Sequence, residues 1–544
     1  MSDITVYSAR KIVTMDPACP AATHVAVRGG RVLAVGGREV ASAWGDAKLD
    51  DRFAGKVLLP GFVEGHSHLL AGGMWRFAYI GYHDRVAPDG GAWPGLTDID
   101  AVLGGLRAAQ AKLPNAEAPL IAWGFDPIFL TAKRLDRHDL DTVSKTRPIV
   151  VVHSNFQLMT VNSAALALAG YSRDSDVTGV QRDGDGEPNG ELQEFAAMFP
   201  IMRRLDIDFG ALGRADAAAE AFAAVARRCG VTTATDLLND LPPAEVEALQ
   251  AMTGRDDFPL RLVPALSGLA RPVAETVAHA KSLREHSRDK LRLGAVKLMT
   301  DGSIQGFTAQ LKWPGYYRGP DHGIWNIAPE QLFETGAALH AAGIQMHIHV
   351  NGDAASELAL DALEAALSAA PRFDHRHTLQ HCQMADRAQF RRMRALGLCV
   401  NLFANHLYYF GDQHRDITMG PDRAHRMDAC GSALAEGVPL AIHSDAPVTP
   451  MGPLFTAWCA VNRTTASGRV LGPNERIALD QALRAITLGA AYTLKLDGEI
   501  GSIEVGKRAD FAVLEADPYE VGGEGLKDIT VWGTVLGGRA FPNA

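Results

Sequence analysis

The sequence of 544 residues has few cysteines, and their spacing does not suit bonding to one another or to a shared ion. The six lie at positions 19, 229, 382, 399, 430 and 459. No two of them have the C-x-x-C spacing, which argues against both a disulfide framework and a thiolate zinc site. We therefore expect most of them to be small buried apolar residues.

Long apolar runs and basic runs are also missing. No segment approaches the ~20 apolar residues of a membrane span, and the opening MSDITVYSARKIVTMD lacks the apolar core of a signal peptide. We expect a cytoplasmic protein with no membrane partner. The net charge of -10, from 53 basic and 63 acidic residues, is small for this length. With no Lys/Arg run to follow a phosphate backbone, we expect no nucleic-acid partner.

The middle of the chain alternates apolar, strand-like runs with Ala-rich helical segments. The helical segments 217–230, 329–343 and 480–494 carry apolar residues at helical spacing. Eight runs are strand-like, and eight strands close a (β/α) barrel. They begin at residues 57, 230, 261, 294, 343, 376, 398 and 438. The predicted fold class is therefore α/β, with a TIM-like (β/α)8 barrel over residues 57–495.

The interval between the first two runs is longer than one barrel crossover requires, which predicts a large insertion at residues 75–225. It has strand-like runs of its own, PLIAWGFD and PIVVVHSN, and a Gly-rich hairpin, RDGDGEPNGEL. Insertions that follow the carboxyl end of a barrel strand lie over the active-site face. We expect this one to act as a lid or a substrate wall.

Both chain ends are rich in short β-type runs. The segment VAVRGGRVLAV has a Gly-Gly pair between two strand-like runs, which is a strong hairpin signal. From residue 498 onward, short β-rich runs are again separated by glycine. We predict one small composite β-sandwich domain, built from residues 1–56 and 496–544.

The strongest local motif is PGFVEGHSH, in which His66 and His68 follow an apolar strand. Side chains two residues apart on a strand point to the same side, so both imidazoles can bind one metal ion. Alone, the motif suits two surface imidazoles equally well. Further metal-binding side chains, however, lie near the ends of later strand-like runs, where a barrel builds its active site: Lys297, His349, His381 and Asp445.

At these motifs the chain resembles the amidohydrolase superfamily, in the branch that includes N-substituted formamide deformylases. The matching segments run in the family's order over nearly the whole chain. They are PGFVEGHSH, VNSAAL, PNGEL, GVTTATD, VKLMTDGSIQG, HIHVNGD, RHTLQHCQ, GVPLAIHSDAPVTP and AAYTLKLDGEIGSIEVGKRADFAVL. The resemblance implies the barrel, the β-sandwich and a divalent metal cofactor. Zinc suits these ligands best, although they also accept manganese, iron, cobalt or nickel, and one or two ions remain open.

The resemblance also implies a ligand set. His66 and His68 match the pair that binds the more buried metal, and Lys297 matches a lysine that is carboxylated in many relatives and bridges two metals. The remaining implied ligands are His349, His381 and Asp445. A buried ammonium beside a cation would be repelled, so Lys297 needs this modification or a shifted pKa. The alternative is an ion pair between Lys297 and Asp301.

Asp445 is our candidate for the catalytic proton carrier. It would take the proton of the attacking water and pass it to the leaving nitrogen, as amide hydrolysis requires. An alternative role for Asp445 is to cap the helix that follows it.

Six further residues are weaker candidates for substrate contact or for orienting the ligands: His153, His347, Asp353, Gln380, His406 and His443. Each histidine among them is also compatible with an ordinary buried polar residue. Asp353 either orients a ligand or caps the following helix, and capping is slightly favoured. Aromatic side chains gather at 313–317 and 407–410, where they either line an apolar pocket or pack within loops.

Gln380 departs from the branch, whose members frequently have glutamate before the sixth-strand histidine. A neutral amide can orient a neighbour but supplies no charge, so the substrate preference need not follow the relatives.

The predicted function is metal-dependent hydrolysis of a C–N bond in a small molecule, such as an N-substituted formamide or an N-acyl compound. One alternative is a non-hydrolytic lyase, isomerase or hydratase on the same scaffold. Another is an inactive relative with a binding or regulatory role. The expected partner is a small-molecule substrate, and the sequence is also compatible with a homo-oligomer.

Overall fold

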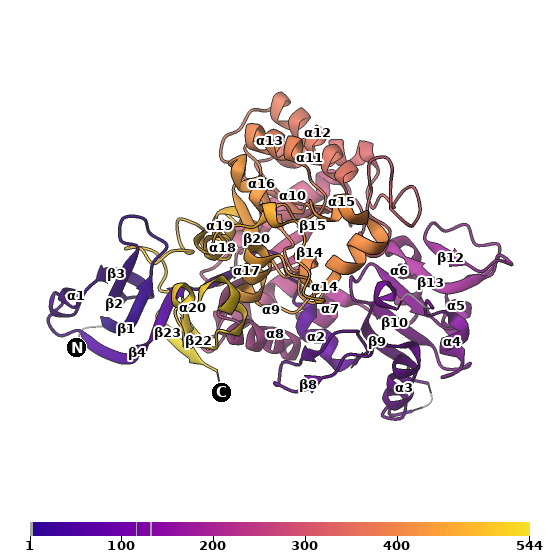
Figure 1. Ribbon diagram of the computed structural model, residues 1–544, viewed down its shortest axis with the longest axis horizontal. Helices are drawn as coiled ribbons and strands as arrows, with labels where there is room; N and C mark the ends of the chain where they lie inside the picture. Colours follow the sequence, from indigo (N-terminus) through magenta and orange to yellow (C-terminus); the bar gives the residue numbers. More distant parts are fainter. Residues whose placement is uncertain (1–3, 116, 131–132, 544) are drawn as a thin grey trace.

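The computed structural model describes residues 4–115, 117–130 and 133–543. Three sheets follow one another across the molecule in Figure 1. A sheet containing strands from both chain ends lies at one side, a curled sheet surrounded by helices lies in the middle, and a third sheet lies at the opposite side.

The central sheet has eight strands, and every neighbouring pair is parallel. In spatial order they are β5 (Phe62–Glu64), β14 (Val231–Asn239), β15 (Arg261–Ser267), β16 (Ala295–Met299), β17 (Met346–Val350), β18 (Thr378–His381), β19 (Cys399–Leu402) and β20 (Leu440–Ile442). The edge strands approach each other just beyond their ends, where Ser67 and Ala446 form a parallel bridge. Each strand-like run predicted from the sequence forms one of these strands, so the α/β class with a parallel sheet is confirmed.

Helices cover the outside of this curled sheet (Figure 1). Those that follow successive strands are α9 (Pro243–Gly254), α10 (Val273–Glu285), α11 (Pro329–Ala341), α12 (Asp353–Ala369) and α13 (Arg387–Leu396). Alternate strand residues such as Val296, Ile348 and Val400 are fully buried in the same apolar cluster as Leu283 and Leu360 of these helices. Because strand side chains alternate between faces, the residues between them point to the inside of the curl.

One predicted helix is divided in two. The segment 480–494 forms α18 (Leu479–Ala485) and α19 (Leu488–Thr493), separated by the non-helical backbone of Thr487. The break allows the chain to pass close under the sheet. A Cβ added to Gly489 would lie 2.3 Å from the carbonyl oxygen of Leu440 in β20. Residues of α19 then pack with Val63 and Val263 inside the curl.

Strands from both chain ends form a continuous seven-stranded sheet. In spatial order it consists of β23 (Arg539–Pro542), β22 (Val531–Leu536), β21 (Phe511–Leu514), β4 (Lys48–Pro60), β1 (Thr5–Val13), β2 (Ala21–Arg28) and β3 (Arg31–Gly36). The predicted hairpin is confirmed: β2 and β3 are antiparallel, and Gly29 and Gly30 between them both have positive φ, +56° and +74°. Glycine adopts this turn without steric cost.

The chain between β5 and β14 builds the third sheet. Its strands are β12 (Val180–Arg182), β13 (Pro188–Gln193), β11 (Leu158–Val161), β10 (Ile149–His153), β9 (Leu120–Phe125) and β6 (Ala78–Tyr79). Helices of the same segment include α3 (Ile99–Gln110), α4 (Arg137–Asp141), α5 (Ser163–Ala169), α6 (Glu194–Arg204) and α8 (Asp216–Arg228). Asn155, in the loop after β10, donates to Ser303 beyond β16 at 2.8 Å, so this segment contacts the strand ends of the central sheet.

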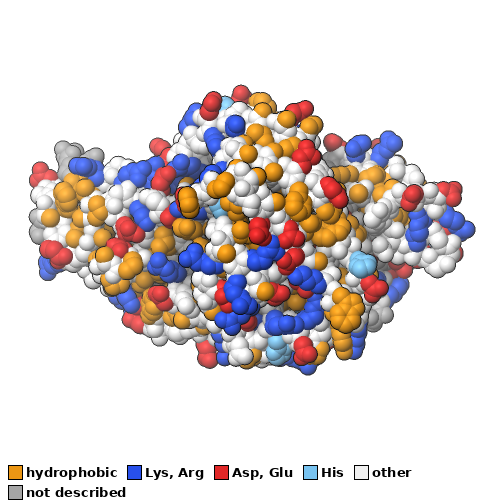
Figure 2. Space-filling view, turned by 90° about the horizontal axis from the view of Figure 1, so that it is seen from above, with side chains coloured by type: hydrophobic (Ala, Val, Ile, Leu, Met, Phe, Trp, Pro, Cys, Tyr) orange, Lys and Arg blue, Asp and Glu red, His pale blue; other side chains and the backbone are white. Residues whose placement is uncertain are grey.

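The exposed charges agree with the small net charge of the sequence and with its lack of basic runs. On the face seen in Figure 2, basic and acidic side chains are interspersed, without a continuous basic area. None of the helices in the described part of the chain combines the length and the apolar character that crossing a bilayer requires.

A buried ion pair joins the central sheet to the seven-stranded sheet. Arg261, the first residue of β15, lies 2.6 Å from Asp510, and both side chains are nearly inaccessible to solvent. We expect Asp510→Ala to lower the free energy of unfolding by about 3–5 kcal/mol, because it removes the nearest counter-charge of the buried Arg261 and leaves the more distant Asp289 carboxylate, at 3.7 Å. Glu520→Ala, which removes an exposed pair with Arg10, should change it by less than about 1 kcal/mol. Chemical denaturation of the three proteins measures the difference, and equal losses would contradict this account.

Candidate metal centre

Three of the titratable side chains near the centre come from strand positions that face the inside of the curl, whereas His66, His68, His443 and Asp445 lie just beyond strand ends. In β17 (Met346–Val350), Met346, Ile348 and Val350 belong to the apolar cluster shared with the helices. His347 and His349 are the alternate residues of the same strand, so they lie on the inner face. Lys297 alternates in the same way with Val296 and Leu298 of β16.

The closest grouping of possible ligands is centred on the Asp445 carboxylate. Its Oδ1 lies 3.3 Å from His66 Nε2 and 3.4 Å from His68 Nε2, and its Oδ2 lies 3.9 Å from His381 Nδ1. Tetrahedral ligands about 2.1 Å from an ion are about 3.4 Å apart. Asp445, His66 and His68 therefore have the carboxylate-to-imidazole separations that one metal ion requires.

His443 joins this grouping. A ligand atom from each of His66, His381 and His443 lies within 4.8 Å of the others, and the His66 and His443 rings stack at 4.7 Å. The sequence placed His443 among the weaker candidates, but it lies within 4.8 Å of two of the predicted ligands, His66 and His381.

Several polar atoms here are buried and lack a hydrogen-bond partner among the described residues. They are Lys297 Nζ, His381 Nδ1, both ring nitrogens of His443 and Asp445 Oδ1. Buried polar atoms are rarely left unpaired, because they lose their hydration without compensation. A bound cation would satisfy the nitrogen lone pairs and the carboxylate oxygen, so the donor set fits a divalent metal.

Hydrogen bonds outside the centre fix the two histidines of the H-x-H motif. His66 Nδ1 lies 2.8 Å from Gln380 Oε1, and His68 Nδ1 lies 2.9 Å from the carbonyl oxygen of Leu237. An imidazole that donates from Nδ1 keeps an unprotonated Nε2. Both Nε2 atoms face Asp445, so these bonds select the tautomer that can bind a metal.

Gln380 bridges two histidines. Its Nε2 lies 2.9 Å from His347 Nδ1, and its Oε1 also accepts a bond from Asn401 at 2.9 Å. The neutral amide thus donates to one imidazole and accepts from another, which a carboxylate in this position could not do. His347 accordingly orients Gln380 and has no contact with Asp445 among those described.

Burial keeps the imidazoles neutral. It holds the pKa of His66, His381 and His443 well below the usual value and lowers the pKa of His349 to about 3. Burial also lowers the pKa of Lys297 to about 7, an effect that the Asp445 charge opposes. Unprotonated nitrogen is the form that binds metal ions.

Lys297 does not form the alternative ion pair with Asp301. Within the described residues its Nζ has no hydrogen-bond partner. Asp301 instead accepts bonds from the backbone N–H groups of Gln310, Asn351 and Gly352, at 2.9 to 3.0 Å. The lysine is therefore left beside the histidine cluster without a salt bridge.

His349 lies beside the Asp445 grouping. Its ring centroid is 4.5 Å from that of His381, but its Nε2 contacts the Gly302 carbonyl oxygen at 3.1 Å and Asn351 Nδ2 at 3.2 Å. The structure thus brings His66, His68, His381 and Asp445 together, and places Lys297 and His349 next to them.

Two of the weaker candidates lie elsewhere. Asp353 is the first residue of α12 and accepts bonds from the backbone N–H groups of Lys312 and Ala354, so it stabilises a helix start. His153 Nε2 bonds Thr160 within the insertion sheet, and His153 does not line the cavity described next.

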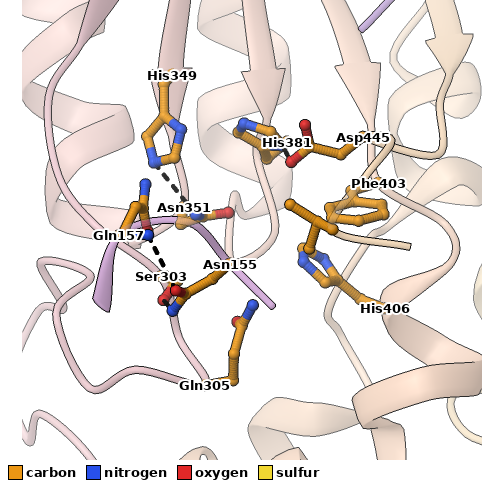
Figure 3. A pocket seen from close by; sticks show the side chains of 11 residues that line it. Asn155, Gln157, Ser303, Gln305, His349, Asn351, His381, Phe403, His406 and Asp445 are labelled. Atoms are coloured by element: carbon orange, nitrogen blue, oxygen red, sulfur yellow. Dashed lines mark hydrogen bonds and ion pairs between the residues drawn. The ribbon is translucent and has the colours of Figure 1, made fainter. Parts of the chain in front are cut away.

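A cavity of about 240 Å³ opens beside the centre, as Figure 3 shows. His381 and Asp445 lie on one side of it, with Phe403 and His406 next to them. Across the cavity lie side chains from two loops: Asn155 and Gln157 after β10, and Ser303 and Gln305 after β16. His406 is thus a cavity residue, as the sequence suggested.

Sequence reasoning missed the polar wall opposite Asp445. It selected His153, whereas the residues that reach the cavity are Asn155 and Gln157, two and four positions later in the same segment. The left-handed backbone of Phe156, at φ +58°, makes the local turn. Glu64 was also missed: its carboxylate accepts bonds from Ser444 N and Oγ at 2.9 and 3.0 Å and so fixes the segment before Asp445.

The predicted aromatic segments do not line the cavity. Trp313 is 93% exposed, Tyr316 is buried in an apolar cluster, and Phe403 is the one aromatic carbocycle among the described lining residues. Loop packing therefore accounts for segment 313–317, and segment 407–410 lies in α14 (His406–Gln413), where Leu407 and Phe410 are buried.

Comparisons with known proteins cover nearly the whole chain. The model of the amidohydrolase family matches residues 54–541. N-substituted formamide deformylase of Arthrobacter pascens is 27% identical over 99% of this chain and 98% of its own length. Protein LONG AFTER FAR-RED 3 of Arabidopsis thaliana is also 27% identical, over 97% of this chain and 90% of its own length.

Solved structures share the fold. The crystal structure of an uncharacterized metal-dependent hydrolase from Pyrococcus horikoshii OT3 has a TM-score of 0.73 and 19% identity. The match covers 96% of this chain and 99% of that chain.

The role of Gln380 can be tested by two substitutions. We expect Gln380→Leu to weaken zinc binding about 10–100-fold, because His66 loses the acceptor that fixes its tautomer. Gln380→Glu should retain most of the affinity, since a carboxylate still accepts the His66 proton. Zinc affinity measured by competition with a chromophoric chelator distinguishes them. A matched control is Gln383→Leu, which removes a buried amide with only a long contact to Met427. Unchanged affinity in Gln380→Leu would contradict the role.

Proposed function

Because this chain belongs to the amidohydrolase family, we propose that it hydrolyses a C–N bond of a small amide with the help of a divalent metal ion. One observation carries the proposal: His66 Nε2 and His68 Nε2 converge on Asp445 Oδ1, an oxygen without a hydrogen-bond partner among the described residues. The buried imidazoles of His381 and His443, which also have unpaired ring nitrogens, lie beside them. The relative named N-substituted formamide deformylase supports the small-amide class.

The residues proposed to hold the metal are those already predicted from the sequence. They are His66, His68, Lys297, His349, His381 and Asp445, and the geometry adds His443 to them. Zinc is the proposed ion because imidazole and carboxylate ligands suit it. One ion fits the grouping around Asp445, and the neighbouring Lys297 and His349 would serve a second.

Carboxylation of Lys297 is part of the proposal. Burial lowers the pKa of the amine to about 7, so a large share of it is unprotonated at neutral pH and can add to carbon dioxide. The product is an anionic oxygen ligand in place of an ammonium that a cation would repel.

The metal ion and the protein side chains have different roles in the proposed reaction. When bound, the ion supplies an acidified water and polarises the scissile carbonyl. Asp445, at the edge of the cavity, holds the water proton during attack and returns it to the leaving nitrogen. Gln380 and the Leu237 carbonyl keep His66 and His68 in one tautomer throughout. His406 and Phe403 bound the space in which the substrate lies.

Metal content tests the proposed centre. Elemental mass spectrometry on protein purified without chelator should give one to two ions per chain for the wild type and a large loss for His66→Ala. The control is His138→Ala, whose side chain is 62% exposed and distant from the centre. Near two ions, reduced by Lys297→Ala, would support a lysine bridge, and about one ion surviving that change would exclude it. Absence of metal from every preparation would overturn the proposal.

Hydrolysis itself is tested with labelled water. In H₂¹⁸O, the acyl product of a formamide and N-acyl amide panel should carry ¹⁸O. Asp445→Asn should lower kcat about 100-fold or more, because the amide cannot carry the proton. An acyl product formed without the label would exclude hydrolysis and favour a lyase, isomerase or hydratase reaction.

A further inference from the structure

Three carboxamide oxygens in the cavity wall have no hydrogen-bond partner among the described residues. They are Gln157 Oε1, Gln305 Oε1 and Asn351 Oδ1. The three residues are only 6, 3 and 4% exposed. A buried acceptor without a donor loses free energy relative to its hydrated state, so several at one cavity indicate a ligand that supplies donors.

The same wall offers no charge to a substrate. No lysine or arginine occurs among the described residues that line the cavity, and its one carboxylate, Asp445, belongs to the proposed metal centre. A carboxylate or phosphate on the substrate would be desolvated without a cationic partner. Burial lowers the pKa of His406, which also lines the cavity, to about 3.

The backbone of Gln157 is fixed while its side-chain oxygen is free. Its N–H donates to Asn155 Oδ1 at 3.0 Å, and its carbonyl accepts a bond from Glu194 N at 2.7 Å. Asn155 is in turn bonded to Ser303 at 2.8 Å. These bonds fix the backbone from which the Gln157 side chain reaches the cavity, so no backbone entropy need be lost there on binding.

We infer that the substrate is an uncharged amide whose leaving side carries further N–H donors, such as a carboxamide or ureido group, and that Gln157, Gln305 and Asn351 select it. The inference rests on the proposed function, since it assigns the scissile bond to the side of the cavity where His381 and Asp445 lie. The carboxamides lie across the cavity from them (Figure 3).

The inference separates this chain from an enzyme for apolar formamides. A site built to bond N–H groups discriminates strongly against an analogue that lacks them, because its acceptors are then buried and unpaired. An apolar N-substituent should therefore be a poor match for this wall, although it would leave the chemistry at the scissile carbonyl unchanged.

Three formamides of nearly equal size test this selection. N-formylglycinamide carries a carboxamide, N-formylglycine a carboxylate, and N-isobutylformamide an apolar group of the same shape. With the metal-loaded protein, we expect kcat/KM for N-formylglycinamide to exceed that of each of the others by about tenfold or more.

Substitutions of the cavity glutamines test whether these residues cause the preference for N-formylglycinamide. Gln157→Leu and Gln305→Leu should each lower the ratio of kcat/KM for N-formylglycinamide to that for N-isobutylformamide by about fivefold or more. The control is Gln250→Leu, because Gln250 is a glutamine of α9 that bonds the His286 carbonyl oxygen and does not line the cavity. It should leave the ratio unchanged.

The kinetic results distinguish a failure of the inference from a failure of the proposed function. Hydrolysis of all three compounds without the preference, or with N-formylglycine preferred, would overturn the inference and leave the hydrolase standing. Hydrolysis of none would count against the proposed function for this class of amide. Calorimetric binding of the three compounds then decides the inference separately: tighter binding of N-formylglycinamide supports it, and equal or absent binding overturns it.

Discussion

Side chains on a β-strand alternate between its two faces, and the centre depends on this constraint. In β16, β17 and β19, every second residue is apolar and packs against the helices outside, and β18 contributes Leu379 to the same cluster. The residues between them are Lys297, His347, Gln380 and Asn401, with His349 one alternation further along β17. Because the strands are parallel and in register, these polar groups meet inside the curl. The apolar residues that hold the sheet against its helices thereby fix the positions of the polar ones.

Bringing so many polar groups together in a space closed to water requires each to be neutral, bonded or matched by a ligand. The Gln380 amide meets this requirement for three side chains at once, since it contacts His66, His347 and Asn401. Beside the cavity, the atoms without a hydrogen-bond partner among the described residues form two sets. One set surrounds Asp445, and the other lies across the cavity on the carboxamides. The two sets are chemically different, which suits a cation on one side and a neutral molecule on the other.

The sequence was sufficient to predict the central sheet, because each strand is a continuous apolar run between helical segments. It also identified His66, His68, His381 and Asp445, which stand at the ends of those strands and meet in the structure. Residues on turns were harder to predict. Asn155 and Gln157 reach the cavity through a turn with a left-handed residue, and no periodicity marks such a turn. The division of the helix at Thr487 depends on contact with β20, which is a tertiary effect that local spacing does not contain.

The seven-stranded sheet has β21 beside β4, with Leu514 opposite Val57, although nearly the whole chain separates them in sequence. The ribosome completes β4 with the other N-terminal strands, so the edge of β4 that pairs with β21 stays unpaired until β21 emerges much later. An unpaired edge is a template for other strands. The interval during translation, more than the finished protein, is therefore when this chain is most exposed to pairing with a neighbouring copy of itself.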